Sequence, residues 1–325
     1  MISLKKYGID FEGSIENAVK IMPVNIPDKE TIREKNGLRW TKRVSEGRYG
    51  FVDEWISADN TSIYEKISKR EEGNLLTEAC LQIAARNCLR LIGHETSVSE
   101  VKYILRSDRR ITFMMEPFLE VLYLQNALHF LHGERRMRGE TFDFWFLQIF
   151  SNICLLLGYL EENLRLNHRD LKGDNILISM KPMTRTYNIP YAGNEWTINV
   201  EHEIKLVDFG LSCRSGVNAG TVYEVTDLCP KDGRDIYFLL CYFYAQPTFR
   251  EMVSRDLLAV IEDWLFEPAG WRVKDFLLRH GLERLSWISF LVNNRNFDCK
   301  KCCPVRILNW IATSHPKILK KCVSI

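Results

Sequence analysis

The sequence predicts an α+β fold, with several strand-type runs before residue 120 and a long helical stretch after it. Strand-type runs occupy residues 40–44, 63–67 and 111–118, and an amphipathic apolar stretch occupies 142–160. The chain has 325 residues with 46% hydrophobic content, enough to bury a large core. Polar residues interrupt the stretch at 142–160, which therefore predicts a core helix and no transmembrane segment.

Two acidic motifs in the middle of the chain point to phosphoryl transfer. Residues 166–179 read L-N-H-R-D-L-K-G-D-N-I-L-I-S, and V-D-F-G follows at 207–210. Transfer of a γ-phosphoryl group requires positioned charge and a base near the incoming hydroxyl. We expect Asp170 to orient that hydroxyl and accept its proton, and Lys172 to neutralise the transferring phosphate. Hard cations prefer oxygen ligands, so we expect Asn175 and Asp208 to hold Mg²⁺ (or Mn²⁺) on ATP.

These motifs resemble those of the eukaryotic-type Ser/Thr protein kinase superfamily. H-R-D-L-K-G-D-N matches the family's catalytic-loop pattern H-R-D-L-x-x-x-N at every specified position, and each motif lies beside a strand-type run. A lone H-R-D tripeptide would be an ordinary surface turn, but the two motifs occur together and in order. The resemblance implies a bilobal fold with a small β-rich N-lobe, one main N-lobe helix and a larger, mainly helical C-lobe. We expect an N-terminal extension at 1–39, the N-lobe at 40–116, and the C-lobe at 117–325 with an inserted hairpin or loop near 180–202.

The segment at 45–52, S-E-G-R-Y-G-F-V, fits the family's glycine-rich phosphate loop with its first glycine replaced by serine. Gly47 and Gly50 would let the backbone approach the phosphates, and Val52 would cover one face of adenine. Strand 111–118 and the following hinge would border the purine through Met115 and through the backbone near Glu116 and Phe118. The resemblance adds Leu177 to the nucleotide contacts. A methionine pair in a strand is also ordinary core filling.

Lys66, in the run 63–67, is the expected partner of the ATP phosphates, and the alternative, Lys69, is a better candidate for a surface lysine. Glu78, in a helix expected at 75–91, would form the family's lysine–glutamate ion pair. Alternatively, Glu78 is a surface residue near the helix N-terminus, where acids are favoured. The lead into this helix resembles the casein kinase 1 and vaccinia-related kinase group. The family usually has alanine, against the adenine ring, at the position of Tyr64. The bulkier tyrosine would weaken the binding of nucleotide.

Beyond V-D-F-G the chain departs from the family. The A-P-E tripeptide is absent, and Val222-Tyr223-Glu224 stands near its place. Thr221 and Tyr223 form a T-x-Y pair, which is either a phosphorylation switch or a chance feature of the loop. These departures are similar in style to those in kinases of large DNA viruses.

Ten cysteines fit reduced thiols in an intracellular, cytoplasmic protein, and the N-terminus lacks the apolar region of a signal peptide. For a viral chain the host cell or the virion is the expected place. The spacing of Cys299, Cys302, Cys303 and His315 has a passing likeness to that of a zinc site. The alternative is that these cysteines are ordinary core thiols. Cys322 lies in a formal C-a-a-X sequence, which indicates either lipid anchoring or a basic tail. With 44 basic and 42 acidic residues, no nucleic-acid partner is expected.

The sequence therefore predicts an ATP-dependent protein kinase that phosphorylates Ser or Thr of protein substrates, the Ser/Thr preference resting on Lys172-Gly173 by family likeness. Two alternatives remain open. One is a pseudokinase that binds nucleotide as a scaffold, favoured by Tyr64, Ser45 and the altered activation segment. The other is a small-molecule phosphotransferase on the same fold.

Overall fold

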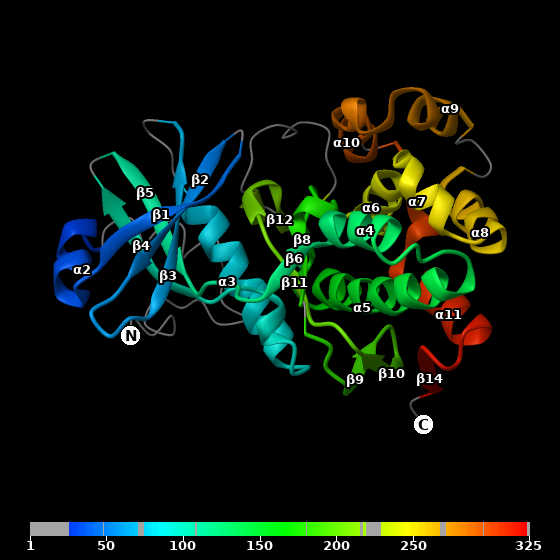
Figure 1. Ribbon diagram of the computed structural model, residues 1–325, viewed down its shortest axis with the longest axis horizontal. Helices are drawn as coiled ribbons and strands as arrows, with labels where there is room; N and C mark the ends of the chain where they lie inside the picture. The colour runs from blue at the N-terminus through cyan, green and yellow to red at the C-terminus, as the bar shows by residue number, and fades with distance from the viewer. Residues whose placement is uncertain are drawn as a thin grey trace. The chain divides into compact units, whose positions relative to one another are not determined.

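The computed structural model describes residues 26–47, 49–70, 75–107, 109–179, 181–214, 217–218, 229–266, 271–294 and 296–323. The chain divides into two compact units (Figure 1). Unit 1 contains residues up to Leu119 together with 209–212 and 216–220, and unit 2 contains the rest. The main division thus falls between Leu119 and Glu120, three residues beyond the predicted boundary. The T-x-Y pair and Ser324-Ile325 lie outside the described residues.

Unit 1 is built on a five-stranded antiparallel sheet of order β1-β2-β3-β5-β4. The ladder between β2 and β3 runs without a break from Gly50 opposite Ser68 to Ile56 opposite Ser62. The elements of this unit are α2 (Lys29–Asn36), β1 (Arg39–Glu46), β2 (Gly50–Ile56), β3 (Ser62–Ser68), α3 (Leu76–Arg90), η3 (Glu95–Ser97), β4 (Val101–Ser107), β5 (Arg110–Met115), η5 (Phe209–Leu211) and β13 (Val217–Asn218).

The helix α2, from the predicted N-terminal extension, packs on one face of this sheet. Asp28 caps it by accepting hydrogen bonds from the backbone of Glu30 and Thr31 at 2.9 and 3.2 Å, which satisfies two donors of its first turn. Its buried Ile32 joins an apolar cluster that includes Trp55 of β2. Residues 26–36 are therefore an integral part of unit 1.

A buried ion pair joins α2 to β3. The Lys29 Nζ atom lies 3.0 Å from Oε1 of Glu65, whose side chain is fully buried, and Thr112 Oγ1 donates to the same oxygen at 2.8 Å. Successive side chains of a strand point to opposite faces. Glu65 therefore points toward α2, and its neighbour Lys66 points to the other face of the sheet.

Unit 2 is mainly helical, with short strands. Its elements are β6 (Val121–Tyr123), α4 (Leu124–Gly133), α5 (Glu140–Leu164), β7 (Leu166–Asn167), η4 (Gly173–Asn175), β8 (Ile176–Ser179), β9 (Arg185–Tyr191), β10 (Asn194–Val200), β11 (Ile204–Leu206), β12 (Cys213–Arg214), α6 (Arg234–Ala245), α7 (Pro247–Met252), α8 (Arg255–Phe266), α9 (Trp271–His280), η6 (Gly281–Arg284), α10 (Leu285–Asn293), η7 (Lys300–Cys302), α11 (Pro304–Ser314) and β14 (Leu319–Val323).

The core of unit 2 is formed by α5 and α6. Every residue of α6 is buried, and Phe146 of α5 packs against Phe243 of α6 and Phe249 of α7 at ring-centroid distances of 5.4 and 5.0 Å. Among the described residues, α5 alone is long and apolar enough to cross a membrane, but 89% of its apolar window is buried within the protein. This burial is that of a core helix, as predicted from its interrupting polar residues. The fold class is therefore α+β, as predicted.

The predicted insertion forms an antiparallel hairpin of β9 and β10, and β14 pairs with the free edge of β10. Trp196 is fully buried and donates from Nε1 to the Tyr191 carbonyl oxygen at 2.9 Å. The Tyr191 ring contacts α5 at Gly158, where a Cβ atom would lie 2.5 Å from Cζ of that ring. Cys322 lies in β14 opposite Glu195, so its backbone belongs to the sheet.

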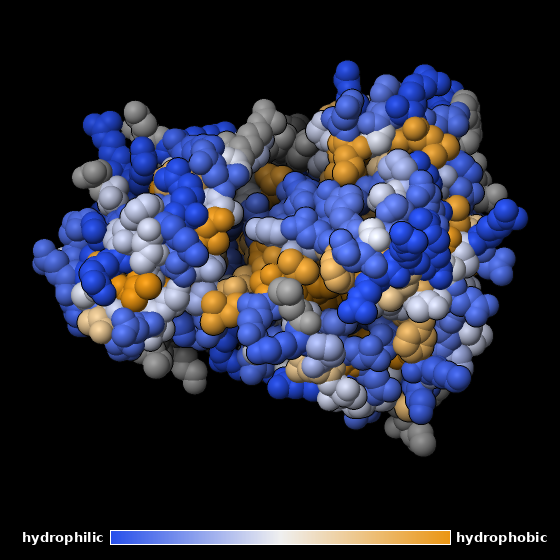
Figure 2. Space-filling model, viewed as in Figure 1, coloured by the Kyte–Doolittle hydropathy of each residue, from blue (hydrophilic) through white to orange (hydrophobic). Residues whose placement is uncertain are grey.

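Helices α9 and α10 present apolar side chains to solvent. Leu278, Trp287 and Phe290 are 46%, 39% and 57% exposed, and Figure 2 shows orange surface over these helices. Phe276 and Trp287 pack against each other, with their ring centroids 4.2 Å apart and their planes tilted by 36°.

The expectation that all ten cysteines are reduced is wrong. Cys213 and Cys229 form a disulfide, with their Cα atoms 6.2 Å apart. Composition indicates the compartment but cannot show which two cysteines the fold brings together. The zinc alternative has no support either, because the described residues contain no cluster of three potential ligands.

We expect Lys29→Met to lower the free energy of unfolding by about 3–5 kcal/mol, because it leaves the Glu65 carboxylate buried without its cation. The double variant Lys29→Met/Glu65→Met should recover most of this loss. Lys42→Met is the matched control, since the Lys42–Glu54 pair is 3.7 Å long and the lysine is 68% exposed. Urea unfolding measures all three, and equal losses for Lys29→Met and Lys42→Met would contradict the expectation.

Candidate active site

In unit 1 the predicted lysine and glutamate form an ion pair. Lys66 Nζ binds Glu78 Oε1, and the two side chains are 17% and 5% exposed. Glu78 lies in the first turn of α3 and is buried, so its alternative interpretation as a surface residue is wrong. Lys69 instead pairs with Glu46 at 2.6 Å, with its side chain 39% exposed, as expected for a surface lysine.

Three of the predicted nucleotide contacts share one face of the sheet with each other. Lys66 lies directly opposite Val52 of β2 and Phe113 of β5, and Tyr64 lies opposite Met115. Directly opposed residues, and residues two apart on one strand, project from the same face. Val52, Lys66 and Met115 are therefore brought together on the α3 side of the sheet, and so is the unusual Tyr64.

The two glycines of the predicted phosphate loop differ in their surroundings. A Cβ atom on Gly50 would lie 2.6 Å from the Ile67 carbonyl oxygen, so glycine is needed there for the close approach of β3. A Cβ atom on Gly47 would meet only the Gly50 oxygen, at 3.9 Å. Gly47 N also donates to that oxygen at 2.9 Å, which closes the turn between β1 and β2. Gly47 therefore has open space around it, whereas Gly50 is enclosed by β3.

The backbone of Glu116 is engaged within unit 1. Its N–H donates to the Glu100 carbonyl oxygen at 2.8 Å, and the Ser99 hydroxyl donates to its carbonyl oxygen. A carbonyl oxygen has two lone pairs, so that of Glu116 has room for a second donor such as a purine amine. The half-buried Phe118 follows in the same segment.

In unit 2 the catalytic-loop residues converge on one carboxylate. Asp170 Oδ2 accepts hydrogen bonds from Lys172 Nζ and from Asn175 Nδ2, both at 3.0 Å. Asn175 Nδ2 also donates to the Asp170 carbonyl oxygen at 2.8 Å. Because Asn175 uses its amide nitrogen in these bonds, its amide oxygen is the atom suited to a cation.

The second motif is tied to the first by its backbone. Val207 N donates to the Asn175 carbonyl oxygen at 3.1 Å, and a ring nitrogen of His168 lies 3.0 Å from the Val207 carbonyl oxygen. Asp208 follows with φ 65° and Arg169 has φ 69°. Left-handed backbone is costly for residues with a side chain and is concentrated at functional sites.

Negative charge accumulates around these loops. The pKa of the Asp174 carboxyl is raised by burial and by Asp170, although Lys172 opposes the shift. The pKa of Tyr123 is raised by burial and then by the charges of Asp174 and Asp208, which places both carboxylates near that ring. Such a surplus of carboxylates favours a divalent cation. Asn175 and Asp208 supply oxygen ligands of the kind that Mg²⁺ takes alongside phosphates and water.

Leu177 occupies the middle of the sheet next to this site. It lies in β8, opposite Tyr123 of β6 and Lys205 of β11, and is 7% exposed.

Residues outside the H-R-D-L-K-G-D-N motif support the catalytic loop, and their supporting roles were not predicted from the sequence. The buried carboxylate of Asp235 accepts hydrogen bonds from the backbone N–H groups of His168 and Arg169, both at 2.7 Å. Asn167 Oδ1 accepts from the backbone of Lys231 at 2.6 Å. A buried acid in the first turn of an otherwise apolar helix was the signal available for Asp235.

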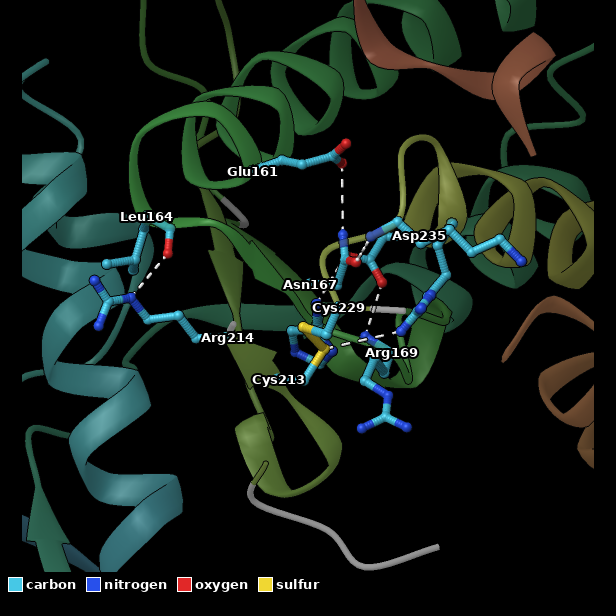
Figure 3. The surroundings of a disulfide bond; sticks show 11 residues. Glu161, Leu164, Asn167, Arg169, Cys213, Arg214, Cys229 and Asp235 are labelled. Atoms are coloured by element: carbon cyan, nitrogen blue, oxygen red, sulfur yellow. Dashed lines mark hydrogen bonds between the residues drawn. A yellow bond between two sulfur atoms is a disulfide. The ribbon is translucent and has the colours of Figure 1, made fainter. Parts of the chain in front are cut away.

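Glu161 lies behind this network (Figure 3). Asn167 Nδ2 donates to its Oε2 at 3.5 Å. Burial, followed by the charges of Asp235 and Asp232, raises the pKa of Glu161 to about 9, although Arg234 opposes the shift. Glu161 is therefore protonated at neutral pH.

The chain is similar to a viral kinase. No family model matches it. Among curated proteins it is similar to "Probable kinase 098L" of Invertebrate iridescent virus 3, with 34% identity over 250 residues. That match covers 71% of this chain but 44% of the relative, so the chain spans less than half of the relative's length. The predicted resemblance to the protein kinase superfamily and to viral kinases is confirmed.

Among solved structures the chain matches a crystal structure of a kinase domain at 17% sequence identity. The match covers 56% of this chain and 53% of the other, with a TM-score of 0.36. A likeness at this TM-score is too weak to bear on the fold or the function of the chain.

We expect Gly173→Ala to destabilise the catalytic loop by about 1–3 kcal/mol, as overpacking does. A Cβ atom there would lie 2.7 Å from Cε1 of Tyr242, a buried residue of α6. Gly193→Ala is the matched control, because Gly193 also lies in a turn of unit 2 but has no atom within 4 Å of a Cβ position. Its positive φ adds strain, so thermal unfolding of Gly173→Ala combined with Tyr242→Leu is the deciding measurement: without recovery in that double variant, the contact is not the cause.

Glu161→Gln should flatten the dependence of stability on pH. The pKa of Glu161 is raised from 4.5 to about 9 in the folded state, so between these values the folded chain keeps a proton that the unfolded chain releases. The free energy of unfolding therefore falls as pH rises, by at most about 1.4 kcal/mol per pH unit. Urea unfolding at pH 6, 7 and 8 measures this slope. The exposed Glu195→Gln should keep the parent slope, and an unchanged slope in Glu161→Gln would refute the assignment.

Proposed function

We propose that this chain is an ATP-dependent protein kinase that transfers the γ-phosphate to Ser and Thr hydroxyls of proteins. The observation that carries the proposal is the arrangement of Asp170, Lys172 and Asn175 around one carboxylate oxygen, at 3.0 Å from each nitrogen. The backbone bond between Val207 and Asn175 attaches the Asp208 loop to the same group.

In this proposal Asp170 is the base. The substrate hydroxyl donates its proton to the carboxylate as its oxygen forms a bond to the γ-phosphorus, and the bond from that phosphorus to the bridging oxygen of ADP breaks. Lys172 neutralises charge on the phosphoryl oxygens during transfer.

Asn175 and Asp208 would hold Mg²⁺ on the ATP phosphates, where the cation draws off negative charge. Lys66, held by Glu78, would bind the phosphates, with the backbone at Gly47 and Gly50 covering them. The adenine would lie against Val52, Met115 and Leu177, and the backbone at Glu116 and Phe118 would bond its edge.

The preference for Ser and Thr rests on family likeness in Lys172-Gly173. Tyr64 is the observation that favours the pseudokinase alternative, because it projects from the same face as Lys66 and Met115. We further propose protein substrates and an intracellular site of action, in the host cell if the chain is viral like its relative. No nucleic-acid role and no lipid anchor at Cys322 are proposed.

The test is Mg²⁺-dependent transfer of labelled γ-phosphate from ATP to the chain itself and to a general Ser/Thr protein substrate. We expect Asp170→Asn and Asp208→Ala each to lower the rate by about 10²–10⁴-fold, because each removes a group that acts in transfer. Asp263→Asn is the matched control. Its carboxylate is 60% exposed and pairs at the surface with Lys301, so the parent rate should persist.

The rival functions give different results in the same assay. ATP binding without transfer, in folded parent protein, would support a scaffold. Transfer to small hydroxyl compounds but not to proteins would support a small-molecule phosphotransferase. Phosphorylation of tyrosine alone would overturn the proposed Ser/Thr preference.

A further inference from the structure

The disulfide of unit 2 joins two segments that flank the catalytic loop (Figure 3). Cys213 is fully buried in β12, directly opposite Asn167 of β7, which immediately precedes His168. Cys229 is half-buried and lies two residues before Lys231. The bridge therefore connects the strand beside the catalytic loop to the turn that begins α6.

The two segments meet at Asn167. Its backbone pairs with Cys213, and its side-chain oxygen accepts the backbone N–H of Lys231 at 2.6 Å. Beyond Lys231, Asp235 binds the backbone of the next two residues of the catalytic loop at 2.7 Å. Arg234 Nη1 lies 3.8 Å from Cys213 Sγ and so links the helix start to the bridge itself.

The segment that carries Cys229 is anchored independently of the disulfide. Lys231 Nζ donates to the carbonyl oxygens of Val292 and Asn294 at 2.7 and 2.8 Å. Gly233 packs closely against the turn at residues 299–303. A Cβ atom on Gly233 would lie 2.4 Å from the Cys299 carbonyl oxygen. Loss of the disulfide would leave this side in place.

The segment that carries Cys213 has much weaker anchors. The β12–β7 ladder contains two residue pairs, Cys213 with Asn167 and Arg214 with Leu166. One side-chain bond supplements it, from Arg214 Nε to the Leu164 carbonyl oxygen at 3.0 Å. Because so short a ladder contributes little, the covalent link to Cys229 is the strongest single connection between β12 and the segment that leads into α6.

We propose that Cys213–Cys229 is a reversible redox site that controls the order of the catalytic loop, with the oxidised state the ordered one. A dithiol, small or protein-bound, attacks one sulfur as a thiolate and then closes on itself. It gives up two electrons and two protons, the sulfur–sulfur bond of the chain breaks, and two thiols form. β12 then loses its covalent connection to the segment that leads into α6, and residues 164–170 lose that support.

The neighbouring thiols do not compete in this exchange. Burial raises the pKa of Cys241 and Cys302 well above that of an ordinary thiol and that of Cys299 to about 12, so these cysteines stay protonated and poor nucleophiles. Cys229 is half-buried and Cys213 is fully buried, so Cys229 is the more exposed residue of the bridge.

The experiment uses the full chain, equilibrated in mixtures of reduced and oxidised dithiothreitol. Iodoacetamide and peptide mass spectrometry record the thiols, and amide hydrogen exchange records the loop. We expect Cys213 and Cys229 to resist alkylation until reductant is added and then to react together. Across the same transition, peptides covering 164–175 should lose protection, whereas those covering 76–90 should not.

The variant Cys213→Ala/Cys229→Ala should show the reduced exchange pattern without reductant, and Cys322→Ala, which changes an exposed thiol, should behave as the parent. Alkylation of both cysteines in the absence of reductant would overturn the proposal, and so would reduction that leaves exchange at 164–175 unchanged.

For catalysis the inference rests on the proposed function, and the reduced state should transfer phosphate more slowly. The exchange readout needs no activity. A redox-linked change in exchange without transfer in either state would support the site and count against the kinase assignment alone.

Discussion

The buried carboxylate of Asp235 is the interaction on which the arrangement of the candidate active site depends. It lies in the first turn of α6, where the helix dipole favours an acid, and both of its oxygens accept backbone N–H groups of the catalytic loop. Charge-assisted bonds of this kind are stronger than neutral ones, and they are stronger still away from water. The most completely buried helix of unit 2 thereby sets the backbone of His168 and Arg169, and through it the position of Asp170. The same loop is bordered by Asn167, the disulfide and the neutral Glu161, so its support consists of polar groups in an apolar setting.

Unit 1 uses buried charge in a comparable way. Two adjacent residues of β3 form ion pairs on opposite faces of the sheet, Glu65 with Lys29 of α2 and Lys66 with Glu78 of α3. An ion pair that is out of water costs free energy to form, but removing one partner costs more. Both helices are consequently bound to the strand that carries Lys66. A change in α2, on the opposite face of the sheet from Lys66, can therefore alter the position of that lysine.

Much of the fold and of the site could be predicted from the sequence, because short motifs record local chemistry. The H-R-D-L-K-G-D-N and V-D-F-G motifs predicted which side chains would converge, and Asp170, Lys172 and Asn175 do so. Lys66 and Glu78 could be chosen because the first lies in a strand-type run and the second in a helix-type run of the sequence. The roles of these residues in transfer stay predictions until activity is measured.

The support of the loop could not be foreseen in the same way. Asp235, Lys231 and Cys229 follow the loop by a long stretch of chain, and their contacts depend on how α6 packs. The disulfide was missed because cysteine content reports the average compartment of a protein, whereas a single bridge depends on the approach of two particular Cα atoms.

The sheet formed by β9, β10 and β14 combines a hairpin with a strand that is synthesised much later. β10 carries the fully buried Trp196, yet one edge of that strand is paired only by residues 319–323. During synthesis the hairpin emerges well before β14, so the backbone donors and acceptors along that edge stay open until almost all of the described chain has been made. Open strand edges attract other strands. The sheet in unit 2 is therefore complete only after β14 has been made. Until then, the unpaired edge of β10 is available to strands of other nascent chains on the same messenger RNA.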